Sequence, residues 1–361
     1  MKLTEENQLL LSAAREFAER EVRGIAVDIE RSGIPQQVLG KMAEMGFLGA
    51  TAPERFGGAS LDTTSYLLLL ETLARYSPSL AFYTYLQNTL VIGSLIHFQD
   101  SEAAGESIRD VSSGKRSGTV VLDEFVSNTE GSNVSIADGD GAVSGSAGFV
   151  MHPDASFLLL SHADAEGNSL FQLNGGVKQT TENRRLGFRG LGFGRISFAA
   201  SKEESVLLGR KSGQSVISLA ASAGSRAVAA IALGIAGEAV DRAAAYSKTR
   251  KTFGSRLEEY RPVAYSLSSM MAETEVLREY LYSSADGGEK EGLVAKLLMT
   301  DAAVRASKLS MQVHGGNGYF EEYQIEKYYR DAMALEALTG NRNSDMGSLA
   351  RQMLGSGSAS I

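Results

Sequence analysis

The segment Arg250-Lys-Thr-Phe-Gly254 places a permanent cation and a hydroxyl group beside a glycine, at the end of an expected long helix. An arginine side chain offers a planar fork of hydrogen-bond donors, which suits a phosphate or a carboxylate. Taken alone, the same residues are explained by a basic helix C-terminus that stops at a glycine. The segment therefore indicates an anion site only if other features support it.

A second glycine-rich segment, Gln312-Val-His-Gly-Gly-Asn-Gly318, follows another expected helix. Glycines let a ligand or a second backbone approach closely, and His314 is a possible acid–base group. The simpler interpretations are a helix stop with a tight turn, and a hydrogen-bonded structural histidine. The segment is not a dinucleotide-binding fingerprint, because no strand precedes it.

Two further segments specify no reaction by themselves. Tyr328-Tyr-Arg-Asp331 puts a cation next to an anion on an expected helix, and a solvated ion pair is the usual explanation for such neighbours. Gly187-Phe-Arg-Gly-Leu-Gly-Phe-Gly194 is not a phosphate loop, because it lacks the Gly-Lys-Ser/Thr ending and a strand-like run follows it.

The composition excludes several other kinds of site. The chain has 361 residues, a net charge of −8 and no cysteine. An acidic chain lacks the basic surface of nucleic-acid-binding proteins, so no nucleic-acid partner is expected. The absence of cysteine excludes disulfides, thiolate zinc sites, iron–sulfur clusters and a cysteine nucleophile. The four histidines are too scattered for a helical metal pair, and no metal is expected.

No secretory signal is visible, because no charged segment precedes an apolar run with a small-residue cleavage site. The longest uncharged stretch, residues 76–99, contains Pro78, Gln87 and Asn88. A membrane span needs about 20 predominantly apolar residues, so this stretch is interpreted as a buried core helix and no membrane span is expected. We expect a cytoplasmic protein.

Helical and β patterns alternate along the chain in three blocks. Helical periodicity predicts an N-terminal helical domain over 1–114, with a helix cap at Thr4. Short β-branched runs separated by turns predict a small β domain over 115–210. Helical patterns return over 211–354, and the Gly- and Ser-rich residues 355–361 predict a mobile tail. The expected helices include 28–46, 61–75, 80–98, 215–248, 262–284, 292–314, 324–338 and 341–354.

In combination, these segments resemble the acyl-CoA dehydrogenase family of flavoproteins. The order and spacing of four segments carry the resemblance: 250–254, Ala295-Lys-Leu297, 312–319 and 326–332. Weaker matches at Met45-Gly-Phe-Leu-Gly49 and Gly187-Phe-Arg189 extend it over nearly the whole chain. The resemblance implies a mostly α fold with a central β domain: an N-terminal helical domain, a small β-barrel or sandwich and a C-terminal four-helix bundle. This agrees with the order of elements expected from the periodicity.

The resemblance also implies an FAD site that spans two subunits, and therefore a homodimer or homotetramer. A charged diphosphate needs hydrogen-bond donors and cations when it leaves water. Asn341 and Asn343 occupy positions where the family has a hydroxyl residue and a glutamine near the cofactor, and their side-chain amides still offer hydrogen bonds. The residues matched to cofactor contacts are Arg250, Thr252, Phe253, Gln312, Gly315, Gly316, Asn341 and Asn343.

The catalytic base of the family has no counterpart at its usual positions. In the family a glutamate removes an α-proton from an acyl thioester while a hydride leaves the β-carbon for the flavin. The two positions used for that glutamate match Thr339 and Ser225, and Arg226 beside the latter matches a substrate-binding residue. A hydroxyl is a poor general base near neutral pH. Glu336, one helical turn before Thr339, is a candidate for a relocated base, although a solvent-exposed helix glutamate is the simpler interpretation.

The β domain departs from the family pattern as well. The stretch that lines the flavin ring in the family is replaced by Leu122-Asp-Glu-Phe125, in which Asp123 and Glu124 are further candidate bases. A second family stretch, Trp-Ile-Thr/Ser, corresponds to Phe149-Val-Met151 here. The aromatic ring is kept, and the hydroxyl near the flavin N5 atom is lost. The diphosphate half of the cofactor site is therefore expected to be retained, and the flavin-ring half to be altered.

Three functions remain open at this point. The first is an FAD-dependent oxidoreductase that desaturates an acyl thioester of CoA or a carrier protein and passes electrons to an electron-transfer flavoprotein. The second is a flavin-dependent oxidase or monooxygenase on the same fold, which does not need the base. The third is a catalytically inactive subunit that binds FAD or acyl-CoA. The fold alone does not decide among them.

Overall fold

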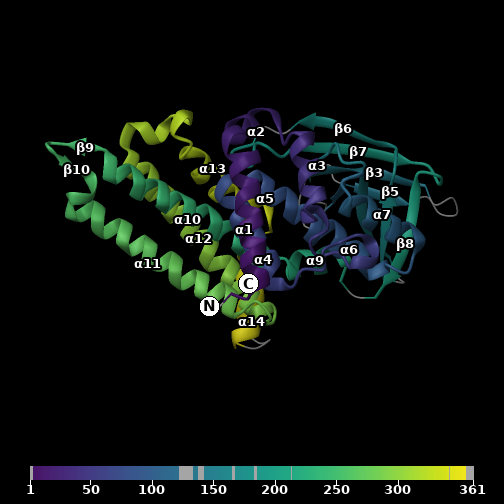
Figure 1. The fold of residues 1–361 in the computed structure, drawn as a ribbon. Coiled ribbons are helices and arrows are strands. Elements are labelled where there is room, and N and C mark those ends of the chain that lie inside the picture. Colours follow the sequence, from purple (N-terminus) through teal and green to yellow (C-terminus); the bar gives the residue numbers. More distant parts are fainter. Residues whose placement is uncertain are drawn as a thin grey trace.

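The computed structural model describes residues 3–121, 133–136, 142–164, 167–182, 185–212, 214–340 and 342–354. Helices come first, strands follow, and helices return (Figure 1). The N-terminal helices lie between the strands on one side and the long C-terminal helices on the other. This arrangement confirms the mostly helical fold with a central β region. The expected tail, 355–361, lies outside the described residues.

The N-terminal block is built from short helices with clear stops. Thr4 caps the first helix as expected, because its hydroxyl accepts a hydrogen bond from the backbone N–H of Asn7 at 3.1 Å. The expected single helix at 28–46 is wrong: Gly33 adopts a φ of 87° and Pro35 follows it, so the chain turns there. The α-helices are α1 (Glu5–Phe17), α2 (Ala26–Ser32), α3 (Gln36–Glu44), α4 (Thr63–Tyr76), α5 (Pro78–Tyr85), α6 (Gly93–Leu95) and α7 (Glu102–Ser112).

The stretch expected as one helix at 80–98 also changes form along its length. After α5 it widens into a π-helical segment, Leu86–Ile92, before α6. Asn88 lies in this segment, and its side-chain amide donates hydrogen bonds to the carbonyl oxygens of Phe47 and Thr84. The buried amide thus ties the widened turn to a neighbouring segment, as expected where a helix departs from regular geometry.

The middle block is a sandwich of two four-stranded sheets. Their strand orders are β1-β4-β5-β8 and β2-β3-β7-β6; β1 and β4 pair in parallel, and the other pairs of described strands are antiparallel. Leu158 and Phe171 of one sheet and Val143 and Ile196 of the other share one buried apolar cluster. The strands are β1 (Gly118–Val120), β2 (Asn133–Ile136), β3 (Val143–Met151), β4 (Phe157–Asp164), β5 (Gly167–Leu173), β6 (Val177–Glu182), β7 (Phe193–Ala200) and β8 (Ser205–Lys211).

The C-terminal block surrounds one central helix, α10, which is buried along most of its length. A Cβ atom at Gly234 would lie only 2.4 Å from the carbonyl oxygen of Glu71, so the glycine lets α10 and α4 approach closely. The helix expected at 215–248 is interrupted at Gly224, where the chain bends by 42°. The elements are α9 (Val216–Ala223), α10 (Ser225–Thr249), β9 (Lys251–Thr252), β10 (Ser255–Arg256), α11 (Arg261–Ser283), α12 (Glu289–His314), α13 (Glu326–Leu338) and α14 (Arg342–Leu354).

Helices α10 and α12 run in parallel, so their first turns share one end of the bundle and their last turns share the other. At the first end, a Cβ atom at Gly292 would lie 3.5 Å from the Cβ of Ser225. At the second end, the rings of Tyr246 and His314 stack with their centroids 4.2 Å apart. Because the two helices run in the same direction, Arg250 after α10 and Gln312 on the last turn of α12 lie at the same end of the bundle.

The Tyr328-Tyr-Arg-Asp331 segment joins the bundle to the β block. The buried carboxylate of Asp331 accepts a hydrogen bond from the backbone N–H of Phe188, which has a φ of 51°. A Cβ atom at Gly187 would lie 2.4 Å from the carbonyl oxygen of Arg330. The interpretation of this segment as a solvated ion pair is wrong, because Asp331 is fully buried at a packed junction.

The described helices were compared with the length and composition of a membrane span. No single helix among them is long and apolar enough to cross a membrane. Helices α9 and α10 pass that test only when they are taken together as a bent pair.

Candidate functional site

The residues expected from the sequence gather at the two ends of the α10–α12 pair. The β9–β10 hairpin and the glycine-rich turn lie beyond the last turns of these helices, whereas Ser225 lies at their first turns. Helix α10 has 25 residues, which makes it about 37 Å long. One chain therefore holds two separate groups of candidate residues.

The hairpin presents its residues to the outside. Arg250 is exposed directly after α10, and the carbonyl oxygen of Thr252 accepts a hydrogen bond from the hydroxyl of Tyr260 at 2.6 Å. Phe253 at the tip has a φ of 46° and is 98% exposed. The apolar area of its ring is therefore left in water, and a contact that covered it would be favourable.

The glycine-rich turn lies at the same end of the bundle as the hairpin. Gln312 is exposed on the last turn of α12, and Gly315 has a φ of 58°. A Cβ atom built at Gly315 or Gly316 would meet no described atom within 4 Å. This open space lets a ligand approach the backbone amides directly.

His314 is a packed structural residue in this turn. Its ring stacks on Tyr246, and its Nδ1 lies 2.8 Å from the carbonyl oxygen of Ser310. Burial lowers its pKa, so the ring stays neutral. The amide of Asn317 donates to the hydroxyl of Tyr246 at 3.0 Å. These contacts support the structural interpretation and hold the turn in place.

The donor set at this end fits a dinucleotide diphosphate. It combines the guanidinium of Arg250, the amide of Gln312 and the accessible backbone of the two glycines. These are the charged and neutral donors that a diphosphate requires. That this half of an FAD site is retained stays a prediction.

The opposite end contains a small pocket of about 90 Å³, between α9, the starts of α10 and α12 and the ends of α5 and α13. Ser225 and Thr339, the two positions matched to the family's base, both line it. The hydroxyl of Thr339 donates to the carbonyl oxygen of Leu335 at 2.8 Å, and that of Ser225 donates to Ser222 at 2.9 Å. The structure thus brings both positions into one pocket, with each hydroxyl bound to the backbone.

A buried ion pair, which the sequence did not reveal, completes this pocket. The Nζ of Lys296 lies 2.7 Å from Oδ2 of Asp345 and donates to the carbonyl oxygen of Thr339 at 2.8 Å. Both charged residues line the pocket. Asp345 resembles any acidic residue in the first turn of a helix, where the helix dipole favours it. The only sequence signal was the lysine of the Ala295-Lys-Leu297 match.

Tyr85 is the third titratable residue of this pocket. Burial, with the nearby Asp345 carboxylate, raises the pKa of its phenol above the usual value. Its hydroxyl therefore keeps its proton at neutral pH.

Other expected residues lie elsewhere. The carboxylate of Glu336 is 3.6 Å from Arg342 and does not line the pocket. Arg226 donates to the backbone carbonyl of Ser284 at 2.8 Å and to that of Gly288 at 2.5 Å. Asn343 is exposed on α14. Asn341, Asp123 and Glu124 lie outside the described residues.

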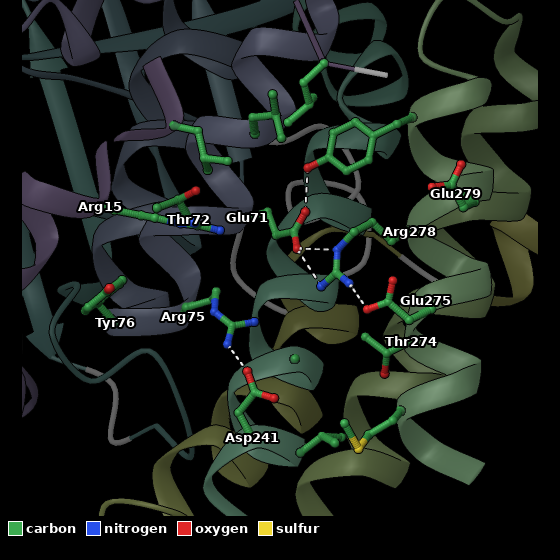
Figure 2. Close-up of a pocket in the computed structure, with 17 residues that line it drawn as sticks. Arg15, Glu71, Thr72, Arg75, Tyr76, Asp241, Thr274, Glu275, Arg278 and Glu279 are labelled. Atoms are coloured by element: carbon green, nitrogen blue, oxygen red, sulfur yellow. Dashed lines mark hydrogen bonds and ion pairs between the residues drawn. The ribbon is translucent and has the colours of Figure 1, made fainter. Parts of the chain in front are cut away.

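A larger cavity of about 680 Å³ lies between α1, α4, α10 and α11, away from all these residues (Figure 2). The carboxylate of Glu71 at its centre accepts hydrogen bonds from Tyr282 and Arg278. Arg75 is paired with Asp241 across the same cavity. The residues matched to the family's base positions do not line this cavity, so we do not assign it as the reactive centre despite its size.

Two family models match this chain. The model for the N-terminal domain of acyl-CoA dehydrogenases matches residues 4–115, and the model for the C-terminal domain of acyl-CoA dehydrogenases matches residues 212–354. The chain belongs to the acyl-CoA dehydrogenase family. Acyl-CoA dehydrogenases are FAD-dependent oxidoreductases, so the expected enzyme class and cofactor are confirmed.

Whole-chain comparisons agree with this assignment. An acyl-CoA dehydrogenase of Bacillus subtilis (strain 168) is 27% identical over 98% of this chain and 100% of its own length. The CarC subunit of the caffeyl-CoA reductase-Etf complex of Acetobacterium woodii is 27% identical over 94% of this chain and 96% of its own. A glutaryl-CoA dehydrogenase of Mycobacterium smegmatis in complex with FADH2 shares the fold, with a TM-score of 0.89, 17% identity and coverage of 99% and 97%. The roles of individual site residues remain predictions.

Proposed function

We propose that this acyl-CoA dehydrogenase family member desaturates an acyl thioester between its α- and β-carbons. The observation that carries the proposal is the pocket at the start of α10, where both family base positions meet a buried ion pair. Bound FAD supplies the acceptor for the hydride that leaves the β-carbon. The chain's own residues bind and orient the thioester, exclude water from the pocket and take up the α-proton.

We further propose that two copies of the chain complete each cofactor site. Arg250 and Gln312 lie at one end of α10 and Thr339 at the other, about 37 Å apart along the helix. An extended FAD molecule is shorter than this, so the donors at one end serve a pocket that belongs to a second copy. The exposed Phe253 supports the same arrangement, because association would cover it. A dimer is the minimum assembly, and a tetramer satisfies the same requirement.

An electron-transfer flavoprotein is proposed as the electron acceptor. The CarC relative is named as a subunit of a complex with such a protein, which supports this choice of partner. The acceptor is tested by following its reduction under anaerobic conditions, with oxygen consumption as the competing readout.

A flavin-dependent oxidase or monooxygenase is the second candidate function. The observation that favours it is the loss of a carboxylate at Thr339 and Ser225, whose hydroxyls are bound to backbone carbonyls. Such a reaction would use oxygen and would not need the family's base.

One absorption experiment separates these functions. The purified protein is measured before and after addition of FAD, and then titrated anaerobically with butyryl-, octanoyl- and palmitoyl-CoA. Bleaching of the flavin band by an acyl-CoA supports the dehydrogenase. A yellow protein that no acyl-CoA bleaches, and that consumes oxygen with another substrate, supports the second candidate. A protein that takes up no FAD contradicts both.

A further inference from the structure

Asp345 supplies the only carboxylate among the described residues that line the pocket at the start of α10. Its partner Lys296 lies on α12, and the side chains of Lys296 and Asp345 are only 6% and 17% exposed. The pair is therefore largely removed from open water. A carboxylate that lines the same pocket as Ser225 and Thr339 is a candidate for the reactive group.

Lys296 holds this carboxylate in a fixed position. Its ammonium group binds Asp345 at 2.7 Å and the carbonyl oxygen of Thr339 at 2.8 Å. The lysine lies near the start of α12, a long and well-packed helix, and is 4% exposed. Two acceptors, from the end of α13 and the start of α14, thus orient one cation. A base needs this kind of support to meet a substrate at a defined geometry.

We propose that Asp345 is the base that removes the α-proton of the acyl thioester, with Lys296 as its positioning residue. This inference rests on the function proposed above and names the group that replaces the family's glutamate. In the step, the α C–H bond breaks and its proton forms an O–H bond with the Asp345 carboxylate. The electron pair of that bond passes to the thioester carbonyl oxygen, which becomes an enolate. The step needs no oxidant and is complete as a proton transfer.

The ion pair keeps the pocket electrically balanced through this transfer. Before the step, the anion is the Asp345 carboxylate, and after it the anion is the enolate oxygen. The Lys296 ammonium, 2.7 Å from the Asp345 carboxylate, stays as the cation of the pocket throughout. A buried charge without a partner is very unfavourable, so exchanging one anion for another beside the same cation avoids that cost.

The residues at the family's base positions, Tyr85 and Glu336 are less suited to this role. The hydroxyls of Ser225 and Thr339 donate to backbone carbonyls. Tyr85 keeps its proton, because burial and the Asp345 charge raise its pKa. Glu336, the candidate expected from the sequence, lies beside Arg342 outside the lining of the pocket.

The test measures proton exchange without oxidation. The probe is 3-thiaoctanoyl-CoA, in which sulfur replaces the β-carbon, so no hydride is available to leave. The FAD-loaded protein is incubated with the probe in D2O, and deuterium incorporation at the α-carbon is followed by mass spectrometry. Calorimetry measures the affinity for the probe separately. We expect Asp345→Asn to slow exchange by at least about 100-fold, the usual contribution of a positioned base, and to change the affinity by less than about threefold.

A matched control comes from the neighbouring ion pair between the same two helices. Arg342 of α14 binds Asp301 of α12 with two contacts of 2.9 Å. Asp301→Asn removes one α12–α14 ion pair, as Asp345→Asn does, but Asp301 does not line the pocket. This control is expected to exchange at the wild-type rate, and Asp345→Glu is expected to retain part of the exchange.

Every other result rejects Asp345 as the base, and some of these results also reject the proposed dehydrogenase function. Wild-type exchange by Asp345→Asn, or equal losses in both Asn variants, rejects Asp345 as the base and leaves the dehydrogenase function standing. A wild-type protein that binds the probe without exchange does the same. A wild-type protein that binds neither this thioester nor FAD rejects the proposed function together with the base.

Discussion

The ammonium group of Lys296 donates a hydrogen bond to the carbonyl oxygen of Thr339 at 2.8 Å, across 43 positions of sequence. The contact joins the end of α13 to α12 near its start, and the same ammonium binds Asp345 at the start of α14. One buried cation thus contacts both of the last two helices. Lys296 thus links Thr339, which occupies a family base position, to Asp345, the carboxylate proposed to replace that base.

Removal of this cation is expected to destabilise the fold. Lys296→Met leaves the Asp345 carboxylate and the Thr339 carbonyl without their buried partner, which typically costs about 3 kcal/mol. Urea denaturation at fixed protein concentration measures the change. Lys290→Met, at an exposed position of the same helix, is the control and is expected to change stability by less than about 0.5 kcal/mol. Equal stabilities of the two variants would contradict the buried role of Lys296.

A carboxylate at the family's position is expected to rescue a missing base. Thr339 and Asp345 line the same pocket, so a glutamate at position 339 reaches the same space. In the Asp345→Asn background, Thr339→Glu is expected to restore α-proton exchange by at least about tenfold, part of the usual contribution of a general base. Thr339→Gln in the same background has a similar size without the charge and is the control. Equal exchange rates for the Glu and Gln variants would count against a shared pocket.

The exposed tip of the hairpin is expected to matter for assembly and not for the fold of one chain. Phe253 is 98% exposed, so Phe253→Ala removes no packing within the chain. If a second copy or FAD covers this ring, the variant loses FAD affinity by at least about tenfold, as for a central aromatic contact. Fluorescence titration with FAD and light scattering measure both effects. Tyr265→Ala, at a 68% exposed position of α11, is the control. Unchanged FAD affinity and assembly would remove Phe253 from the site.

The stability of the β block is expected to fall in acid because of His152. Burial lowers the pKa of its imidazole to about 4, whereas the unfolded chain takes up a proton near 6.5. Between these values the unfolded state binds more protons, so the stabilising contribution is present above pH 6.5 and is lost as the pH falls toward 4. The loss amounts to at most about 3 kcal/mol. Denaturation series at several pH values, with His152→Gln for comparison, are expected to show a smaller acid loss in the variant. Equal losses of stability in acid for the wild-type protein and His152→Gln would show that His152 does not cause the loss.

The junction between the β block and the bundle is expected to depend on Gly187. A Cβ atom there would lie 2.4 Å from the carbonyl oxygen of Arg330, so Gly187→Ala forces the two segments apart. Overpacking of this kind costs about 2 kcal/mol. Thermal denaturation compares it with Gly40→Ala, which meets no atom within 4 Å inside α3 and is expected to be neutral or stabilising. A neutral Gly187→Ala would show that the junction yields easily.

Short-range patterns were sufficient to predict much of this protein. The cap at Thr4, the order of helices and strands and the motifs at Arg250 and Gln312 depend on spacing along the chain, which periodicity and a family resemblance capture directly. The break at Gly33 was missed, because a helical pattern on both sides hid one left-handed residue. The cap, the order of elements and the break all depend on local backbone geometry and on side chains that are neighbours in sequence.

The chemistry of the pocket depended instead on packing between distant helices. The parallel run of α10 and α12 places Gln312 at the same end as Arg250 and away from Ser225, which makes two copies necessary in the proposed site. The contact between Lys296 and Asp345 exists because α14 folds back on α12, and no spacing along the chain encodes that meeting. Burial then turns an ordinary surface pair of charges into a base with a fixed partner, since an ion pair away from water is held in one geometry.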